Sequence, residues 1–254
     1  MKAIATISFS LLPVIFVAAF GRSLPDHVME KANQAYIDEA YQEAVSLYEK
    51  IAEMEWESAS LYYNLGNAYY QKGMLGKAIL NYERALRLNP SDEAIRHNLR
   101  IAVGQTADRI EPLPRLFFLD WHDRYVLLQP VDAWAKNVII LVFLTALFIA
   151  LFFVARKKVY KQLCAGVSMV LILLTLAGFY AAGRQYYTVH EKQEAIVMAS
   201  RVVVKSAPGE RGIDLFLVHE GTRVEISNTV RDWSEIRLAN GNIGWIERRA
   251  LEEI

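Results

Sequence analysis

A single cysteine, Cys164, stands among 254 residues, and the 28 lysine and arginine residues are matched by 28 aspartate and glutamate residues. One cysteine cannot form an intrachain disulfide, a CxxC redox pair or a cysteine-based zinc site. Its apolar neighbours also disfavour a reactive thiolate. A formal net charge of zero disfavours nucleic-acid binding, which needs a basic surface facing the phosphates. We therefore expect neither redox chemistry nor a nucleic-acid partner.

The catalytic motifs HExxH, GxSxG and Walker A are also missing. The nearest approach to Walker A covers residues 73–78, but it has the wrong spacing and lacks the hydroxyl that would reach magnesium. The histidines are scattered without metal-ligand spacing; they are His27, His97, His122, His190 and His219. We therefore predict a protein that is not an enzyme, with no catalytic residue, no metal and no cofactor.

Hydrophobic residues, by contrast, make up 54% of the sequence, and many of them lie in three apolar runs. The first run follows Lys2 and ends in small residues, which predicts a cleavable signal peptide over residues 1–21; an uncleaved anchor is the alternative. The other two, residues 137–155 and 163–183, carry no charge and are long enough to span a bilayer. The alternative for this pair is a buried helical hairpin of a soluble protein.

The loop between these two runs, residues 156–162, carries four positive charges and no negative one. The charged residues are Arg156, Lys157, Lys158 and Lys161. Lysine and arginine in short loops mark the cytoplasmic side of a membrane. We therefore predict two transmembrane helices in the lipid bilayer, with both outer ends on the side away from the cytoplasm.

An internal repeat lies within residues 22–109. Residues 44–50 recur 34 positions later, whereas Ala35-Tyr36 recurs after 33 positions as Ala68-Tyr69, which predicts a shorter turn in the first copy. Small residues let two helices touch, aromatic residues fill the space around them, and a proline ends the second helix. The second copy resembles the tetratricopeptide repeat (TPR) consensus at Leu65, Gly66, Tyr69, Ala78, Tyr82, Ala85 and Pro90. We predict two TPR repeats and a polar capping helix over residues 91 to about 103.

The resemblance to TPR proteins implies a concave groove lined by the first helix of each repeat. The implied groove residues are Ser60, Tyr63, Asn67 and Tyr70 in repeat two, Glu30, Gln34 and Ile37 in repeat one, and His97 and Ile101 on the cap. We predict that partner proteins bind there; the alternative is that Tyr63 and Asn67 only pad the superhelix. Because no cationic residue faces inward, a groove for a C-terminal carboxylate is disfavoured.

Residues 110–136 change character, because Pro112 and Pro114 precede a stretch rich in large apolar side chains such as Phe117, Trp121 and Trp134. Tryptophan and tyrosine prefer the headgroup region of a membrane. We expect an aromatic linker at the membrane surface, and the alternative is a soluble helix packed under the repeats.

Residues 190–254 consist of short strands separated by turns, including an Asn240-Gly241 hairpin turn. Trp233, Glu235 and Arg237 alternate with Ser234, Ile236 and Leu238, as in a half-buried strand of a small all-β barrel. Residues 203–208, residues 219–222 and Gly244-Trp245-Ile246 resemble the bacterial SH3 family, whose members bind cell-wall peptides or proteins. We expect Trp233 and Trp245 to be core or groove-wall aromatics.

The fold class we expect is a multidomain membrane protein: all-α TPR repeats, a two-helix transmembrane hairpin and a C-terminal all-β SH3-like barrel. This order, together with the stretch from Glu111-Pro112-Leu113-Pro114 to Trp121, resembles the BatE family of Bacteroides aerotolerance proteins over essentially the whole chain. The resemblance implies a multi-pass scaffold of the bacterial inner membrane, with its TPR and SH3 domains in the periplasm. It also implies von Willebrand A-type Bat partners and a MoxR-type ATPase in envelope or oxidative stress tolerance.

Two other functions stay open at this point. The SH3-like domain could bind a cell-wall ligand, which would make the chain a peptidoglycan sensor. The chain could also be an assembly factor for c-type cytochromes, but there the spans would precede the repeats.

Overall fold

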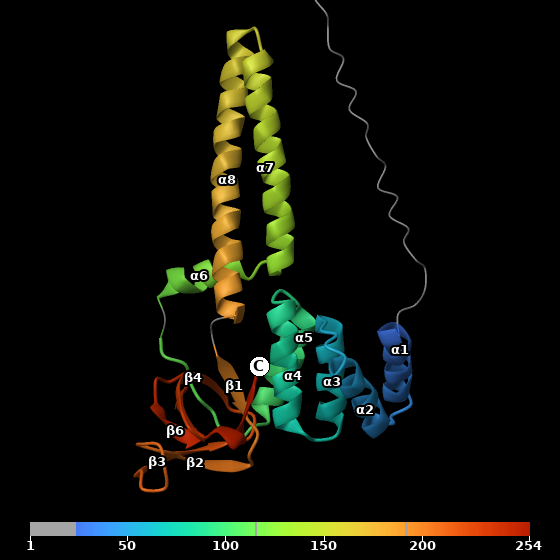
Figure 1. Ribbon diagram of the computed structural model, residues 1–254, viewed down its shortest axis with the longest axis vertical. Coiled ribbons are helices and arrows are strands. Elements are labelled where there is room, and N and C mark those ends of the chain that lie inside the picture. The colour runs from blue at the N-terminus through green and yellow to red at the C-terminus, as the bar shows by residue number, and fades with distance from the viewer. Residues whose placement is uncertain (1–23, 115, 191–192) are drawn as a thin grey trace, which may run out of the picture.

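The computed structural model describes residues 24–114, 116–190 and 193–254. A unit of paired helices and a β-sheet lie side by side, and a long helical hairpin projects away from both (Figure 1). The signal peptide expected over residues 1–21 lies outside the described residues. The coarse expectation of helical repeats, two apolar helices and an antiparallel sheet is confirmed.

Five helices form the repeat unit: α1 (Leu24–Ile37), α2 (Tyr41–Ala52), α3 (Ala59–Gln71), α4 (Leu75–Leu88) and α5 (Glu93–Gly104). Side-chain caps begin two of them, because Ser58 accepts from the Leu61 N–H and Asp92 accepts from the Ala94 and Ile95 N–H groups. A Cβ on Gly66 would lie 2.7 Å from Cδ1 of Tyr82, so α3 and α4 approach closely only with glycine there. All seven TPR consensus positions are buried: Leu65, Gly66, Tyr69, Ala78, Tyr82, Ala85 and Pro90.

The two repeats keep one offset of 34 residues through their turns. α1 ends at Ile37 and α2 begins at Tyr41, while α3 ends at Gln71 and α4 begins at Leu75. Glu39 (φ 58°) and Gly73 (φ 72°) hold the same left-handed position in the two turns. The shorter first turn expected from the sequence is therefore wrong, because the Ala35-Tyr36 match is out of register with the structure.

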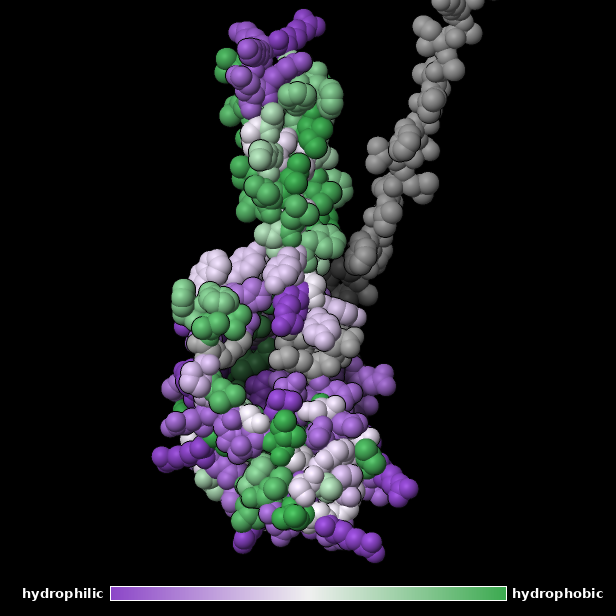
Figure 2. Space-filling view, turned by 90° about the vertical axis from the view of Figure 1, so that its left-hand side faces the viewer, coloured by the Kyte–Doolittle hydropathy of each residue, from purple (hydrophilic) through white to green (hydrophobic). Residues whose placement is uncertain are grey.

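The hairpin consists of α7 (Val131–Val154) and α8 (Lys158–His190), both long and apolar enough to cross a membrane. Figure 2 shows apolar side chains along the hairpin and hydrophilic ones at its tip. The tip carries the exposed residues Arg156, Lys157, Lys158 and Lys161. Because α8 already begins at Lys158, the connection between the helices is shorter than the loop expected over residues 156–162.

Helix α6 (Phe117–Val126) lies across the base of the hairpin (Figure 1). His122 Nε2 lies 2.8 Å from the Tyr180 hydroxyl of α8, and Trp134 Nε1 donates to the carbonyl of Val126 at 3.1 Å. The side chains of Phe117 and Trp121 are 85% and 73% exposed. The linker helix is therefore attached to the hairpin and leaves large aromatic surface uncovered.

An antiparallel sheet contains β1 (Glu194–Val197), β2 (Arg201–Lys205), β3 (Asp214–His219), β4 (Arg223–Val230), β5 (Trp233–Arg237), β6 (Ile243–Glu247) and β7 (Leu251–Glu253). Its strand order is β3-β2-β6-β5-β4-β1-β7, so β3 and β7 are edges and the ladder does not close. Ser234 and Ile236 of β5 and Leu238 directly after it are buried, as the alternation indicates. The SH3-like barrel stays a prediction.

The sheet is docked on the repeat unit through the turn between β3 and β4, residues 219–223, which we call the docking turn. Glu220 Oε1 accepts from the Gly76 N–H at 2.9 Å, which caps α4, whose own N-cap residue Met74 makes no side-chain bond. A Cβ on Gly221 (φ +86°) would lie 2.7 Å from Cγ2 of Thr106 and 2.8 Å from Cδ1 of Ile79. Only glycine allows the turn to come this near.

Charged contacts hold the same junction. The Arg223 guanidinium lies 3.0 Å from Oε1 of Glu83 and 2.6 Å from Oε2 of Glu194. Burial raises the pKa of Glu83 above its usual value, and the nearby Arg223 guanidinium offsets only part of that rise. Asp108 accepts from the His219 N–H at 2.7 Å and from the Thr222 hydroxyl at 2.6 Å. The repeat unit and the sheet are therefore one connected body.

Candidate partner-binding groove

A pocket of about 320 Å³ opens on the first-helix side of the repeats. It is lined by Tyr36, Tyr63, Asn67, Tyr70, Gln71, Tyr82, Asn98 and Ile101. The structure thus brings Tyr63, Asn67, Tyr70 and Ile101 together, as the TPR resemblance implies. We call this surface the groove.

Asn67 holds the floor of the groove together. Its Oδ1 accepts from the Tyr82 hydroxyl at 2.8 Å and from Asn98 Nδ2 at 2.9 Å. Asn98 Nδ2 also lies 3.1 Å from the Tyr63 hydroxyl. Because burial raises the pKa of Tyr82, its hydroxyl stays protonated and remains a donor. Asn67 therefore joins α3, α4 and α5, and its side chain is engaged inside the protein.

Repeat one contains the same tyrosine–asparagine hydrogen bond, but its asparagine lies one residue earlier than the sequence match suggests. The Tyr48 hydroxyl donates to Asn33 Oδ1 at 2.7 Å, with the same separation of 15 residues that joins Tyr82 to Asn67. Asn33 is thus the counterpart of Asn67, and Tyr36, which lines the groove, is the counterpart of Tyr70. A helix turns by about 100° per residue, so an error of one residue selects the wrong face.

Because of that one-residue error, the sequence match predicts three wrong groove residues in repeat one, which are Glu30, Gln34 and Ile37. All three are exposed and none lines the groove, and Gln34 Nε2 donates instead to Asp38 Oδ1 at 2.9 Å. His97 on the cap is likewise exposed outside the groove, where its neighbour Asn98 takes the inward position. Their expected place in the groove is therefore corrected. The 34-residue spacing of the second helices was the signal that could have located Asn33 and Tyr36.

The chemistry of the groove suits a peptide. Its eight lining residues are four tyrosines, two asparagines, a glutamine and an isoleucine, and none of them is charged at neutral pH. Tyrosine is frequent among the residues that dominate binding energy at interfaces, and the amides can pair with a peptide backbone. Within residues 24–114, 116–190 and 193–254, no three His, Cys, Asp or Glu side chains are grouped to hold a metal ion.

The two expected sheet aromatics are both half-buried and lie outside the sheet core. Trp233 lines a second pocket, of about 430 Å³, together with side chains of β2 and β6. Trp245 stands opposite Lys205 and Glu235 in the ladder. The sequence predicts a core or a groove-wall position for these rings, and Trp233 lies in the wall of a pocket.

Comparison with known proteins identifies the helical unit. A tetratricopeptide repeat family model matches residues 59–92, which contain α3 and α4. Over 74 residues the chain is 40% identical to Tetratricopeptide repeat protein 16 of Mus musculus and to that of Homo sapiens. The match covers 29% of this chain but 9% and 8% of those proteins, so the chain spans less than a tenth of their length. TPR repeats are in general non-enzymatic interaction modules, so this unit is a scaffold for protein partners.

Proposed function

We propose that the chain is a membrane-anchored scaffold that binds a protein partner in the groove outside the cytoplasm. The observation that carries the proposal is the groove itself, an uncharged pocket walled by tyrosines on a TPR unit. Recognition there would combine aromatic burial with hydrogen bonds from amide side chains, as in other tyrosine-rich interfaces.

Three features of the hairpin support the membrane part of the proposal. Its two helices have exposed apolar surfaces, its tip is basic, and aromatic side chains of α6 are exposed at its base. In a bilayer this order corresponds to a hydrocarbon-spanning section, a cytoplasmic loop and an interfacial belt. The repeats and the sheet would then share the periplasmic side of a bacterial inner membrane.

The partners that best suit this arrangement are membrane or periplasmic proteins of the von Willebrand A-type Bat class. The support is the resemblance in module order to the BatE family, and the TPR match is consistent with it. In that setting the scaffold would serve envelope or oxidative stress tolerance within a Bat and MoxR complex.

A pair of matched variants tests binding in the groove. Ile101 lines the groove and is 42% exposed, whereas Ile37 is 70% exposed and lies outside it. Ile101→Lys should reduce co-purification of membrane partners at least about tenfold, the effect of losing one contact of about 1.4 kcal/mol. Ile37→Lys should leave it unchanged. Equal recovery with both variants would remove the groove from the proposal.

The orientation is tested by labelling single cysteines in intact cells. In a Cys164→Ala background, Lys50→Cys on α2 and Arg211→Cys in the sheet unit should react with a membrane-impermeant maleimide. Lys157→Cys at the hairpin tip should react only after the cells are opened. All three side chains are exposed in the structure, so a protected Lys50→Cys would contradict the proposed orientation.

A second candidate function is cell-wall binding by the sheet, and the pocket lined by Trp233 favours it. One aromatic ring beside side chains of both charges suits a peptide crosslink of peptidoglycan. The full chain should then sediment with purified murein, and Trp233→Ala should abolish this while Trp56→Ala, an exposed tryptophan of the repeats, should not. Sedimentation that is independent of Trp233 would count against this candidate.

A further inference from the structure

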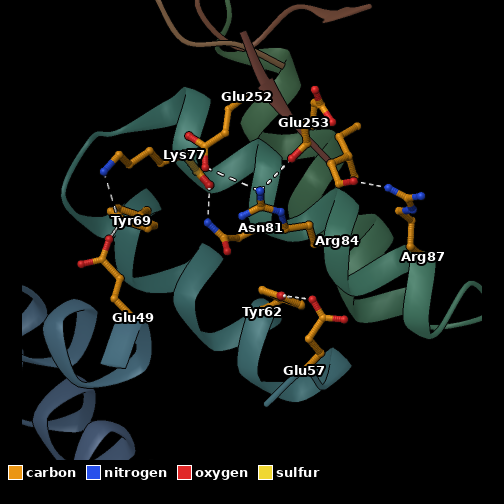
Figure 3. Close-up of polar contacts among 11 residues, drawn as sticks. Glu49, Glu57, Tyr62, Tyr69, Lys77, Asn81, Arg84, Arg87, Glu252 and Glu253 are labelled. Carbon is orange, nitrogen blue, oxygen red and sulfur yellow. Dashed lines mark hydrogen bonds and ion pairs between the residues drawn. The ribbon is translucent and has the colours of Figure 1, made fainter. Parts of the chain in front are cut away.

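A pocket of about 520 Å³ opens where β7 passes α4, and we call it the junction pocket (Figure 3). Residues of α2, α3 and α4 form one wall, and the last residues of the chain shown, Glu252, Glu253 and Ile254, form the other. It shares no lining residue with the groove, because α3 gives Tyr62 and Tyr69 to the junction pocket and Tyr63 and Tyr70 to the groove.

One buried acceptor in this pocket lacks a partner. Asn81 lies on α4, is 3% exposed and lines the pocket, and its Nδ2 donates to the Lys77 carbonyl at 2.8 Å. That bond fixes the orientation of the amide, since a carbonyl can only accept. Oδ1 is then left buried without a hydrogen bond, which is unfavourable unless a donor reaches it. The site therefore calls for an N–H group.

The charge around Asn81 specifies which N–H group. Five carboxylates line the pocket, against the two cations Lys77 and Arg84: they are Glu49, Glu53, Glu57, Glu252 and Glu253. Both cations are already engaged, because Lys77 Nζ lies 3.4 Å from the Tyr69 hydroxyl and the Arg84 guanidinium lies 3.5 Å from Glu252 Oε1. The surplus of negative charge favours a positively charged donor.

We infer that the junction pocket binds a lysine or arginine side chain from a protein partner, with an N–H donated to Asn81 Oδ1. The carboxylates at the mouth would pair with the charge of that side chain, and its alkyl part would lie beside the rings of Tyr62 and Tyr69, over which Arg84 and Lys77 already lie. The inference rests on the proposed scaffold role only in taking its ligand from a protein. Because β7 supplies Glu252 and Glu253, the pocket is complete only while the sheet is docked on the repeats.

The test measures fluorescence anisotropy of a labelled peptide with the full chain in a nonionic detergent. The probe is fluorescein-Gly-Lys-Gly-Lys-Gly-amide, and its control replaces both lysines by norleucine, which keeps the four-carbon side chain and lacks the ammonium group. We expect the lysine peptide to bind and the norleucine peptide to bind at least about tenfold more weakly, as for one lost charged hydrogen bond. Equal binding of the two peptides would overturn the inference.

Variants then locate the site. Glu53→Gln combined with Glu57→Gln removes two exposed carboxylates at the mouth and should weaken the lysine peptide about three- to fivefold. Glu43→Gln, an exposed glutamate of α2 that does not line the pocket, should have no effect, and neither should Ile101→Lys in the groove. Asn81→Leu, which keeps the size of the side chain and removes the acceptor, should weaken the lysine peptide about tenfold.

Each outcome bears on one site. If Asn81→Leu fails to fold, the Glu53→Gln and Glu57→Gln pair still decides the question. Loss of lysine binding with Ile101→Lys but not with that pair would assign the peptide to the groove and reject the junction pocket. If Ile101→Lys loses the membrane partners but still binds the lysine peptide, the groove and the junction pocket are two independent sites.

Discussion

Glu39 adopts a left-handed backbone, φ 58°, at the turn between α1 and α2, where repeat two has Gly73. A side chain in this region meets its own carbonyl oxygen, and glycine avoids the contact because it has no Cβ. Glu39→Gly should therefore raise the free energy of unfolding by about 1 kcal/mol. Urea denaturation followed by helical circular dichroism measures this, and a decrease would mean that Glu39 makes a compensating contact. Gly73→Ala should show the opposite sign.

Asp108 makes the junction sensitive to acid. Burial alone would raise its pKa, but hydrogen bonds from Thr222, from the His219 side chain and from the His219 N–H outweigh burial and lower it. A pKa below the unfolded value, about 3.9, contributes stability above that pH and loses it as the pH falls through the folded pKa. The wild-type chain should therefore lose more stability between about pH 5 and pH 3 than Asp108→Asn does. Parallel pH curves for the two proteins would contradict this role.

At individual positions, sequence reasoning found the repeat packing and half of the groove. Tyr63, Asn67 and Tyr70 were located because repeat two follows the TPR consensus closely. Asn33 and Tyr36 were missed because a two-residue match outweighed the longer match of the second helices. Asn81 was missed for a different reason: an unpaired acceptor is a property of packing, and the sequence holds no record of it.

The docking turn connects two strands of the sheet and also packs against the repeat unit. Gly221→Ala places a methyl group against Thr106 and Ile79 and also strains a positive φ, whereas Gly209→Ala strains a positive φ with nothing within 4 Å. Gly221→Ala should destabilise the chain by about 1–3 kcal/mol more than Gly209→Ala does, since overpacking adds to the backbone term. Thermal unfolding of both variants gives the difference. Equal losses would mean that the turn can move off α4.

The elements themselves were largely predictable, and their contacts were not. The alternation along β5 and the apolar runs of α7 and α8 are local patterns with a period of their own. The bonds from Glu220 to Gly76 and from Arg223 to Glu83 join residues about 140 positions apart. Such pairings leave no periodic signal in one sequence, so two modules were expected where the structure has one connected body.

That connection should appear in the unfolding of the whole molecule. Ile196 of β1 belongs to the same buried cluster as the repeat core, so the repeats and the sheet should unfold in one transition. Arg223→Ala removes the partner of buried Glu83 and should cost about 1.5–3 kcal/mol, splitting the transition in two. Arg248→Ala, which removes an exposed pair with Glu253, should leave a single transition. Two transitions in the wild type would show that the sheet unfolds independently.

The length of helix α8 has a mechanical consequence if the hairpin spans a bilayer as proposed. Its 33 residues run without a break from the hairpin tip, and β1 begins at Glu194, close behind its last residue. A helix of this length measures about 50 Å, which exceeds a hydrocarbon core of about 30 Å. The excess would extend beyond the hydrocarbon core on the side where the sheet lies. A tilt that the surrounding lipid imposed on the hairpin would then shift the end of α8 near which the sheet begins, and the docked repeats and their groove would shift with the sheet.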